Sequence, residues 1–458
     1  MNDLPKAARS ALDLIGRTPM VEVTHIDTGP CRLFLKLENQ NPGGSIKDRI
    51  ARSMIEAAEK DGVLKPGGTI IEATAGNTGL GLAQVATVKG YKLILVVPDK
   101  MAREKILHLR AMGVDVRITR SDVGKGHPEY YQDMAQTIAQ KTGAFFVNQF
   151  ENPANPAAHE ATTGPEIYEQ MEGDVDAISV GVGSGGTLTG LGRYFQKVSP
   201  KTQMILADPK GSILYDYVNT GTYGQAGSWI VEGIGEDFIP VNAQMDLVAK
   251  AYEITDRESV ETARLLLQKE GILAGSSSGT LLAAALRYCR EQTEPKRVVS
   301  LVCDTGAKYL TKMFNDMWVA AHGFEDRTVH GDLRDLIAKR YAEGGVVAIG
   351  PDDSLLTAYN RMRSGDISQM PVVDHGKLVG IIDESDLLNA LEGSDDGLSA
   401  KVGSAMTRNV HTLQSHQPID SLNAVFDRDE VAVVMDGDEL LGLITRVDLI
   451  NHLRRTAK

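Results

Sequence analysis

The chain has 458 residues, of which 42% are hydrophobic and 24% are charged, and its formal net charge is −13. That length predicts two or three domains, and the acidic balance disfavours a nucleic-acid-binding role for the surface as a whole. No apolar run approaches the roughly 18 residues of a membrane-spanning helix, so we expect no membrane partner.

The N-terminal stretch has no continuous apolar core of the signal-peptide type, which predicts a cytoplasmic protein. Cys31, Cys289 and Cys303 are scattered and form no C-x-x-C pair, as is typical of a reducing compartment. We interpret each as a small buried hydrophobic residue rather than a ligand or a nucleophile. The sequence therefore predicts no metal site.

Up to about residue 310, apolar strands, small-residue loops and amphipathic helices alternate along the chain. This alternation predicts an α/β fold with a mainly parallel sheet. Three loops rich in Gly, Ser and Thr, at residues 74–79, 183–187 and 275–279, are expected at the carboxyl ends of strands. Ligands collect at that edge of a parallel sheet, so the three loops should face one crevice.

A predicted helix begins within the segment NPGGSIKDR, residues 41–49. Ser45 and Asp48 form a capping-box pattern, and apolar residues recur at helical spacing after them. Lys47 then lies in the first turn, where the positive end of the helix dipole lowers the pKa of an amine. A neutral amine is the form that makes a Schiff base, whereas the ordinary alternative is a solvated surface lysine.

The segment GVGSGGTLTG, residues 181–190, follows an apolar strand and precedes a helix. Main-chain N–H groups in such a loop suit a phosphate. The glycine spacing with Asp208 at the end of the next strand is also the pattern of a dinucleotide-binding fold. The loop alone therefore leaves open whose phosphate it binds.

Four motifs, in family order, resemble those of the β-synthase branch of the fold-type II pyridoxal-phosphate enzymes. NPGGSIKDR is similar to the lysine motif, TAGNTG to the substrate loop, GSGGT to the phosphate loop, and GSSSG to the loop facing the pyridine nitrogen. The resemblance covers about residues 10–315. It implies a fold-type II catalytic domain with parallel sheets, and it assigns the phosphate to pyridoxal 5'-phosphate.

Roles for individual residues follow from this resemblance. Lys47 would bind the cofactor covalently and act as the catalytic base, Asn77 would hydrogen-bond the ring oxygen, and Ser277 would face the pyridine nitrogen. Ser276 and Ser278 flank Ser277, so a shift of one residue stays open. The expected phosphate ligands are Gly183, Ser184, Gly185, Gly186 and Thr187. The expected substrate-binding residues are Thr74, Ala75, Gly76, Thr78, Gln149 and Gly233.

Three positions depart from the family pattern. Ala75 replaces a usual Ser, while Phe150 and Glu236 stand where animal enzymes carry Tyr. These departures leave side reactions and the preference for a second substrate open. Lys105, with its neighbour Glu104, is interpreted either as a contact to that second substrate or as part of a surface ion pair. Asp208 has the same two interpretations.

Within the branch, the resemblance is strongest to the cystathionine β-synthases. It implies the condensation of L-serine with L-homocysteine to cystathionine and water, with hydrogen sulfide formation from cysteine as a side reaction. O-acetylserine sulfhydrylases, which make cysteine from sulfide, are the enzymatic alternative, and DTGAKYL (304–310) leans toward them. A scaffold that senses an adenosyl ligand is the non-enzymatic alternative.

The C-terminal part of the chain contains an internal repeat. Residues 371–388 align without gaps on the segment around Gly442, so that Gly380 pairs with Gly442. The repeat resembles the paired CBS domains of an α+β Bateman module. We expect three parts, namely a catalytic domain at 1–322, a linker at 323–340 and the tandem CBS-domain module at 341–458. A helix within residues 332–345 is expected to connect the domains.

The CBS resemblance implies a regulatory ligand that contains adenosine. Thr445 and Asp448 match the ribose-binding pattern in the second repeat, whereas Asp383 replaces the hydroxyl before Asp386 in the first. We therefore expect at most one site, which prefers S-adenosylmethionine over ATP, and a repeat without any ligand stays open.

The family is also built on dimers, which predicts a homodimer or homotetramer. Animal members carry a haem-binding extension, whereas His25 and Cys31 lie within the catalytic body. We expect no haem.

Overall fold

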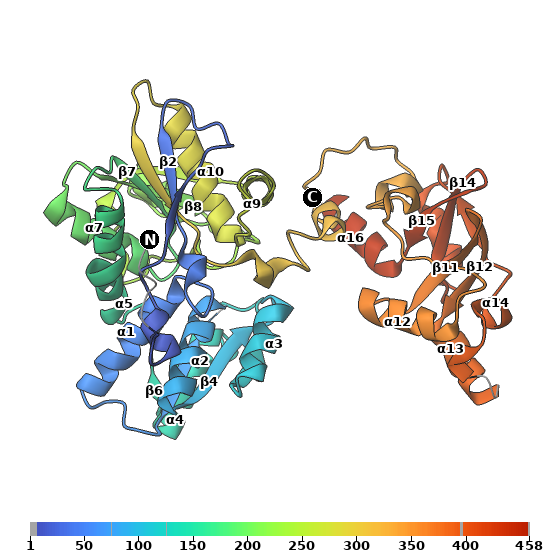
Figure 1. The fold of residues 1–458 in the computed structure, drawn as a ribbon, viewed down its shortest axis with the longest axis horizontal. Coiled ribbons are helices and arrows are strands. Elements are labelled where there is room, and N and C mark those ends of the chain that lie inside the picture. The colour runs from blue at the N-terminus through green and yellow to red at the C-terminus, as the bar shows by residue number, and fades with distance from the viewer. Residues whose placement is uncertain (1–6, 75, 125, 394–396, 457–458) are drawn as a thin grey trace. The chain divides into compact units, whose positions relative to one another are not determined.

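The computed structural model describes residues 7–74, 76–124, 126–393 and 397–456 (Figure 1). The chain forms two compact units, Met1–Met313 and Phe314–Lys458. The first is an α/β unit with the parallel sheets that were predicted, and the second is an α+β unit whose strand pairs are mainly antiparallel. No helix among the described residues is both long enough and apolar enough to cross a membrane.

The larger sheet of the first unit has six strands. All neighbouring pairs are parallel except the pair formed by β1 and β2. In spatial order the strands are β1 (Met20–Glu22), β2 (Arg32–Lys36), β10 (Arg297–Leu301), β7 (Ala177–Val180), β8 (Gln203–Pro209) and β9 (Val248–Ile254). The central strands are buried, as expected for parallel strands with helices on both faces. The principal helices of this part are α7 (Gly186–Val198), α9 (Asp256–Glu270) and α10 (Ser276–Arg290).

The smaller sheet has four strands, all parallel. Their order is β5 (Asp115–Thr119), β4 (Lys92–Pro98), β3 (Thr69–Ala73) and β6 (Phe145–Phe146). Alternate residues of β3 pack into different hydrophobic cores. Ile70 packs in the core with the helices at residues 47–60 and 77–89, whereas Ile71 packs in the core with the helix at residues 131–142. The helices are α1 (Lys47–Lys60), α2 (Asn77–Lys89), α3 (Arg103–Ala111) and α4 (Tyr131–Thr142).

Shorter helical segments complete the first unit. They are η1 (Ala11–Leu14), η2 (Glu38–Gln40), α5 (Ala154–Ala158), η3 (His159–Thr163), α6 (Gly164–Gln170), α8 (Leu214–Thr220), η4 (Met245–Leu247) and η5 (Gly306–Tyr309). One predicted loop is placed differently from the expectation: Gly275 follows α9 and directly precedes α10, so this loop joins two helices. An isolated bridge between Ala274 and Thr305 ties it to the chain after β10.

The second unit contains the two copies of the repeat. In each, an antiparallel strand pair is followed by a helix: β11 (Gln369–Asp374), β12 (Lys377–Asp383) and α13 (Glu384–Gly393), then β14 (Ala432–Asp436), β15 (Glu439–Ile444) and α16 (Arg446–Thr456). The register shifts just after Val372 in one copy and just after Val434 in the other. Val372 pairs with Gly380, and Val434 pairs with Gly442, so the register shift occurs at the same place in both copies of the repeat.

The remaining elements of this unit are α11 (Asp316–Ala321), η6 (Leu333–Leu336), η7 (Tyr341–Glu343), α12 (Leu355–Gly365), η8 (Gly397–Ser399), α14 (Val402–Ala405), β13 (Thr412–Gln414), η9 (Ile419–Leu422) and α15 (Asn423–Phe426). The prediction of a connecting helix within residues 332–345 is wrong, because only the short helical turns η6 and η7 form there. Leu333 and Leu336 pack into the core of the second repeat, and that packing overrides the local helical pattern.

Candidate active site

Lys47 is the first residue of α1. Burial lowers the pKa of its amine, while Cys303, Asp304 and Glu236 act in the opposite direction. The expected direction of the shift is therefore present, with burial as its leading cause. The capping pattern is realised differently from the expectation: Ser45 Oγ accepts from the Lys47 N–H at 3.3 Å, but Asp48 accepts from the N–H of Gly43 at 2.5 Å.

A buried ion-pair cluster fixes the first turn of α1. Arg49 donates to both oxygens of Glu38, at 2.7 and 2.8 Å, and to both oxygens of Glu166, at 2.7 Å each. Lys36 also donates to Glu166, at 2.8 Å. Burial raises the pKa of Glu166, but Arg49 and Lys36 outweigh it and bring the value to about 2. This cluster anchors the helix two residues beyond Lys47.

The segment Gly183–Thr187 runs from the loop after β7 into the first two residues of α7, where its glycines permit close backbone packing. A β-carbon on Gly183 would collide with the carbonyl oxygen of Gly233, and one on Gly186 would collide with Asn155 Oδ1. Gly185 has a φ of +84°, and a β-carbon there would lie 2.6 Å from the main chain of Ala243. The loop therefore forms a tight backbone cradle at a helix N-terminus, which fits a phosphate group.

Two side chains missed by the sequence reasoning support this cradle. Asn155 donates to Ser184 Oγ at 2.9 Å, and its own Oδ1 is buried without a hydrogen-bond partner among the described residues. His159 Nε2 lies 3.3 Å from Thr187 Oγ1, and burial holds the pKa of this histidine well below its ordinary value. Both residues belong to the segment NPAAHE, residues 155–160. They are four residues apart, which places them on the same side of the helical segments α5 and η3.

Asn77 begins α2 and is held by two charged groups. Its Nδ2 donates to Asp304 Oδ2 at 2.7 Å, and its Oδ1 accepts from Lys308 Nζ at 3.0 Å. Lys308 also donates to the carbonyl oxygens of Gly43 and Gly44. Burial lowers the pKa of Lys308 to about 8. The amide expected to meet the cofactor ring is thus tied to the lysine motif.

The three adjacent serines at the start of α10 have different partners. Ser276 Oγ accepts from the Glu232 N–H at 3.1 Å, and Ser278 Oγ accepts from the Cys303 N–H at 2.9 Å. The Ser277 hydroxyl contacts the Cys303 thiol instead, and burial raises the pKa of that thiol to about 12. All three hydroxyls thus have a protein partner, and the choice of Ser277 among them stays a prediction.

The expected substrate loop is assembled around two buried hydroxyls. Thr78 Oγ1 donates to Gln149 Oε1 at 2.7 Å, and Gly76 N–H donates to Thr74 Oγ1 at 3.1 Å. The structure thus brings these residues together at the carboxyl end of β3 and the start of α2. Ala75 lies outside the described residues. Gly233 lies against the phosphate loop at Gly183.

The departures from the family pattern have distinct environments. The Phe150 ring lies 5.6 Å from the Phe238 ring, centroid to centroid. Burial, followed by the charge of Asp237, raises the pKa of Glu236 well above its ordinary value. Asp208 is fully buried and accepts from the Tyr215 N–H at 2.8 Å, with burial raising its pKa to about 7.

Lys105 does not form a surface ion pair with its neighbour Glu104. Only 1% of Lys105 is exposed, and its Nζ lies 2.7 Å from Glu232 Oε2. Glu104 accepts from the Thr311 hydroxyl at 2.7 Å instead. The surface interpretation of Lys105 is therefore wrong.

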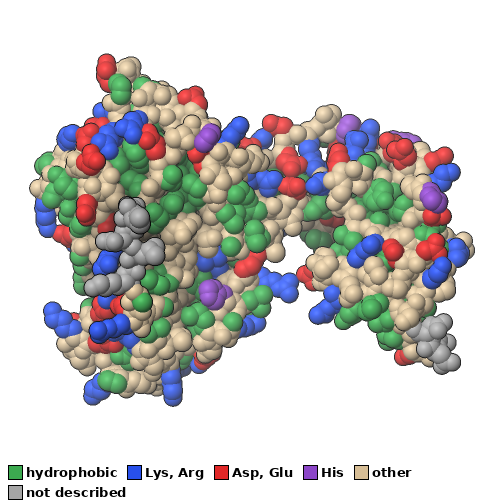
Figure 2. Space-filling view, viewed as in Figure 1, with side chains coloured by type: hydrophobic (Ala, Val, Ile, Leu, Met, Phe, Trp, Pro, Cys, Tyr) green, Lys and Arg blue, Asp and Glu red, His purple; other side chains and the backbone are tan. Residues whose placement is uncertain are grey.

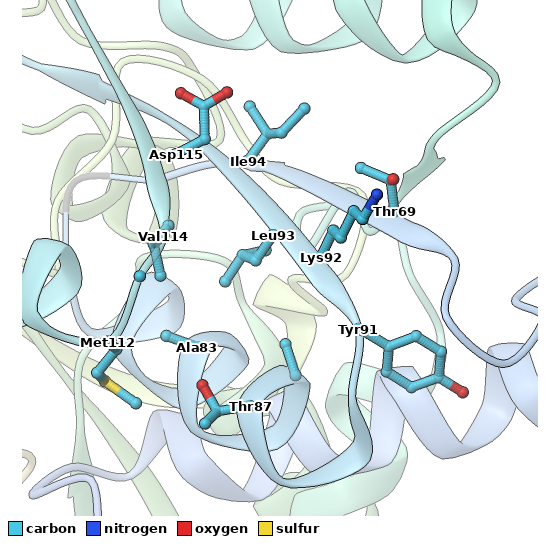
Figure 3. A pocket seen from close by; sticks show the side chains of 12 residues that line it. Thr69, Ala83, Thr87, Tyr91, Lys92, Leu93, Ile94, Met112, Val114 and Asp115 are labelled. Atoms are coloured by element: carbon cyan, nitrogen blue, oxygen red, sulfur yellow. The ribbon is translucent and has the colours of Figure 1, made fainter.

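A hollow of about 440 Å³ lies elsewhere in the first unit (Figure 3). Thr69, Lys92 and Asp115, which line it, are the first residues of β3, β4 and β5. The predicted substrate loop is at the opposite, carboxyl end of β3, so this hollow is separate from the candidate site.

The face in Figure 2 carries acidic and basic side chains interspersed over both units.

In the second unit, the predicted ribose-binding pair caps a helix. Thr445 N and Oγ1 both donate to Asp448 Oδ2 at 2.7 Å. Asp383 and Asp386 repeat this arrangement with reciprocal main-chain hydrogen bonds of 3.1 and 2.9 Å at the start of α13. Helix capping alone therefore accounts for both pairs, and a ligand role stays a prediction.

The residues considered for haem and metals have protein partners. His25 Nδ1 lies 3.2 Å from Glu270 Oε2, and Cys31 Sγ lies 3.5 Å from the carbonyl oxygen of Cys289. Over the described ranges, no group of three or more His, Cys, Asp and Glu residues could hold a metal ion.

Comparisons with known proteins place these features in a family. The family model for pyridoxal-phosphate dependent enzymes matches residues 11–304, and the CBS domain model matches 337–393 and 402–455. A cystathionine β-synthase of Apis mellifera is 33% identical over 99% of this chain and 92% of that protein. Cysteine synthase A of Escherichia coli is 41% identical over 66% of this chain and 94% of its own. A hydrogen sulfide-producing enzyme from Fusobacterium nucleatum, solved by crystallography, is 37% identical with a TM-score of 0.62, covering 66% of this chain and 100% of that structure.

Proposed function

Because the chain belongs to the pyridoxal-phosphate dependent enzymes and carries a C-terminal pair of CBS domains, we propose that it condenses L-serine with L-homocysteine to cystathionine and water. The similarity to the Apis mellifera cystathionine β-synthase, over 99% of the chain and thus both units, supports this reaction. The similarity to cysteine synthase A, by contrast, covers 66% of the chain.

The residues of the site fit the cofactor. The observation that carries the proposal is the Lys47 amine, whose pKa burial lowers, just after Gly43 and Gly44, which Lys308 joins to the Asn77 amide. The charge of Lys47 also acts on His159, which contacts Thr187 of the backbone cradle. Pyridoxal phosphate, when bound, supplies an aldehyde that reacts with amines and a ring that withdraws electrons from the amino-acid α-carbon. The cradle would hold the phosphate, Lys47 the aldehyde carbon, and Ser277 the ring nitrogen.

Lys47 would move the proton in this reaction. Its amine, whose pKa burial lowers, would take the proton from the α-carbon of serine. The carbon–oxygen bond at the β-carbon then breaks, and the hydroxyl leaves as water with the proton that Lys47 took. The homocysteine thiol gives its proton to Lys47 as the carbon–sulfur bond forms, and Lys47 passes this proton to the α-carbon. Thr74, Gly76, Thr78 and Gln149 would hold the substrate carboxylate during these steps.

Synthesis of cysteine from O-acetylserine and sulfide is the second candidate, supported by the 41% identity to cysteine synthase A. Hydrogen sulfide formation from cysteine is a further candidate activity, supported by the similarity to the Fusobacterium nucleatum enzyme. Product identification by mass spectrometry tests the alternatives: the enzyme is offered serine with homocysteine, O-acetylserine with sulfide, and cysteine with homocysteine. Cystathionine formed fastest from serine is the expected result. Cysteine formed fastest from O-acetylserine would replace the proposal by the second candidate.

For the second unit, the proposed ligand is S-adenosylmethionine at Thr445 and Asp448. Hydroxyl and carboxylate oxygens both accept hydrogen bonds from ribose hydroxyls. In the first repeat, Asp383 adds an anion at the matching position, which would repel a nucleotide phosphate but tolerate a sulfonium cation.

A further inference from the structure

A chain of buried hydrogen bonds leads from Lys105 to Asn77. Lys105 Nζ donates to the Tyr309 hydroxyl at 2.9 Å, and this hydroxyl donates to Asp304 Oδ2 at 2.7 Å. The same oxygen accepts from Asn77 Nδ2 at 2.7 Å. Lys105 and Tyr309 are each 1% exposed, and Asp304 is fully buried. The chain therefore connects α3 with the first residue of α2 through groups that water does not reach.

The direction of every hydrogen bond in this chain is fixed by its ends. An ammonium group only donates and a carboxylate only accepts, so the Tyr309 hydroxyl accepts from Lys105 and donates to Asp304. Asn77 must then turn its N–H groups toward Asp304 and its carbonyl oxygen toward Lys308, which donates to it at 3.0 Å. A primary amide has two N–H groups, and Asp304 takes one of them.

Asp304 is held in one orientation by its surroundings. Its Oδ1 is buried without a hydrogen-bond partner among the described residues and packs against Gly275, where a β-carbon would collide with it. Both hydrogen bonds to the carboxylate therefore go to Oδ2. Glu232 lies between Lys105 and Lys312, at 2.7 Å from each, and so fixes the Lys105 ammonium at the other end of the chain.

We propose that Asp304, Tyr309 and Lys105 are positioning residues that set the orientation of the Asn77 amide toward the cofactor ring oxygen. The inference rests on the cofactor-binding role proposed for Asn77. The three residues act on the cofactor through Asn77, since none of them is assigned a contact with the cofactor. The second-substrate contact expected of Lys105 plays no part in cofactor affinity or in a spectrum measured without substrate. Removal of the Tyr309 hydroxyl leaves Oδ2 with one donor, which loosens the carboxylate and lets the amide rotate.

The test measures cofactor affinity and the visible absorption spectrum across pH for the holoenzyme, Tyr309→Phe, Asn77→Ala and the double variant. Tyr309→Phe is expected to weaken cofactor binding about three- to tenfold, as for one lost hydrogen bond, and to shift the spectrum in the same sense as Asn77→Ala. In the Asn77→Ala background, Tyr309→Phe should have no further effect, because contacts in series are not additive. Tyr288→Phe is the matched control, since that hydroxyl donates to Gln203 at 2.9 Å within the same unit.

The outcomes separate the inference from its premise. An unchanged spectrum in Asn77→Ala would refute the role of Asn77 itself. A shifted spectrum in Asn77→Ala with none in Tyr309→Phe, or full additivity in the double variant, would overturn the positioning role. Lys105→Met serves if Tyr309→Phe does not fold, because Glu232 keeps Lys312 as its partner. It should reproduce a smaller shift of the same sign, and no shift would overturn the inference.

Discussion

Arg49 and Glu38 form a two-point ion pair in which the side chains are 2% and 0% exposed. Arg49 follows Asp48 in α1, so its pair with Glu38 fixes the first turn of the helix, which carries Lys47. Breaking a buried pair leaves an uncompensated charge, which costs about 3–5 kcal/mol. Arg49→Met should therefore lower the free energy of unfolding by about that amount in chemical denaturation.

The control for Arg49 is an exposed pair on the same helix. Arg52 and Glu56, four residues apart, are 37% and 43% exposed. Arg52→Met should cost about 1 kcal/mol, because it removes this exposed pair and one hydrogen bond to the Leu12 carbonyl oxygen. Equal losses in the two variants would contradict a special role for the buried cluster.

Glu72 predicts a pH dependence of stability. Burial raises its pKa to about 8 from the model-peptide value of 4.5, so the folded state binds a proton that the unfolded state releases between these values. Stability is therefore fully present below about pH 4.5 and falls as pH rises toward 8. Glu72→Gln should abolish this fall in denaturation curves at pH 6 and pH 9, whereas Glu129→Gln, at an exposed side chain, should leave it in place.

The tight packing around Gly186 allows a test of the proposed phosphate cradle. A β-carbon there would collide with Asn155 Oδ1, so Gly186→Ala must displace either the loop or Asn155. We expect at least about tenfold weaker retention of the cofactor, measured by its absorbance after gel filtration. Gly124→Ala is the control, because a β-carbon at that position meets open space. Full cofactor retention in Gly186→Ala would place the phosphate elsewhere.

The two capping pairs of the C-terminal unit offer a matched comparison for ligand binding. Asp448→Asn should abolish the heat of S-adenosylmethionine binding in titration calorimetry. Asp386→Asn removes the equivalent cap of α13 and should leave that heat unchanged. If S-adenosylmethionine, AMP and ATP all fail to bind the full chain, the adenosyl proposal is wrong.

The order of strands, loops and helices was predictable, because buried parallel strands and amphipathic helices have distinct periodicities. The places of the segments 74–79 and 183–187 between a strand and a helix were also predictable, since their glycines and hydroxyls are contiguous in the sequence. Residues that complete the site through distant contacts were not: Lys105 meets Glu232 and Tyr309, which are 127 and 204 residues away. No local pattern reports such pairs. The expected helix at 332–345 failed for the related reason that core packing of Leu333 overrides local preference.

The most direct test of the central claim, that Lys47 is the cofactor lysine of a serine-using β-replacement enzyme, is an absorbance titration. The purified protein is measured alone, after L-serine and then after L-homocysteine, with Lys47→Ala in parallel. We predict a yellow protein whose band changes with serine and returns with homocysteine, while Lys47→Ala shows no return. A protein without the band, or a band that responds only to O-acetylserine and sulfide, would contradict the account.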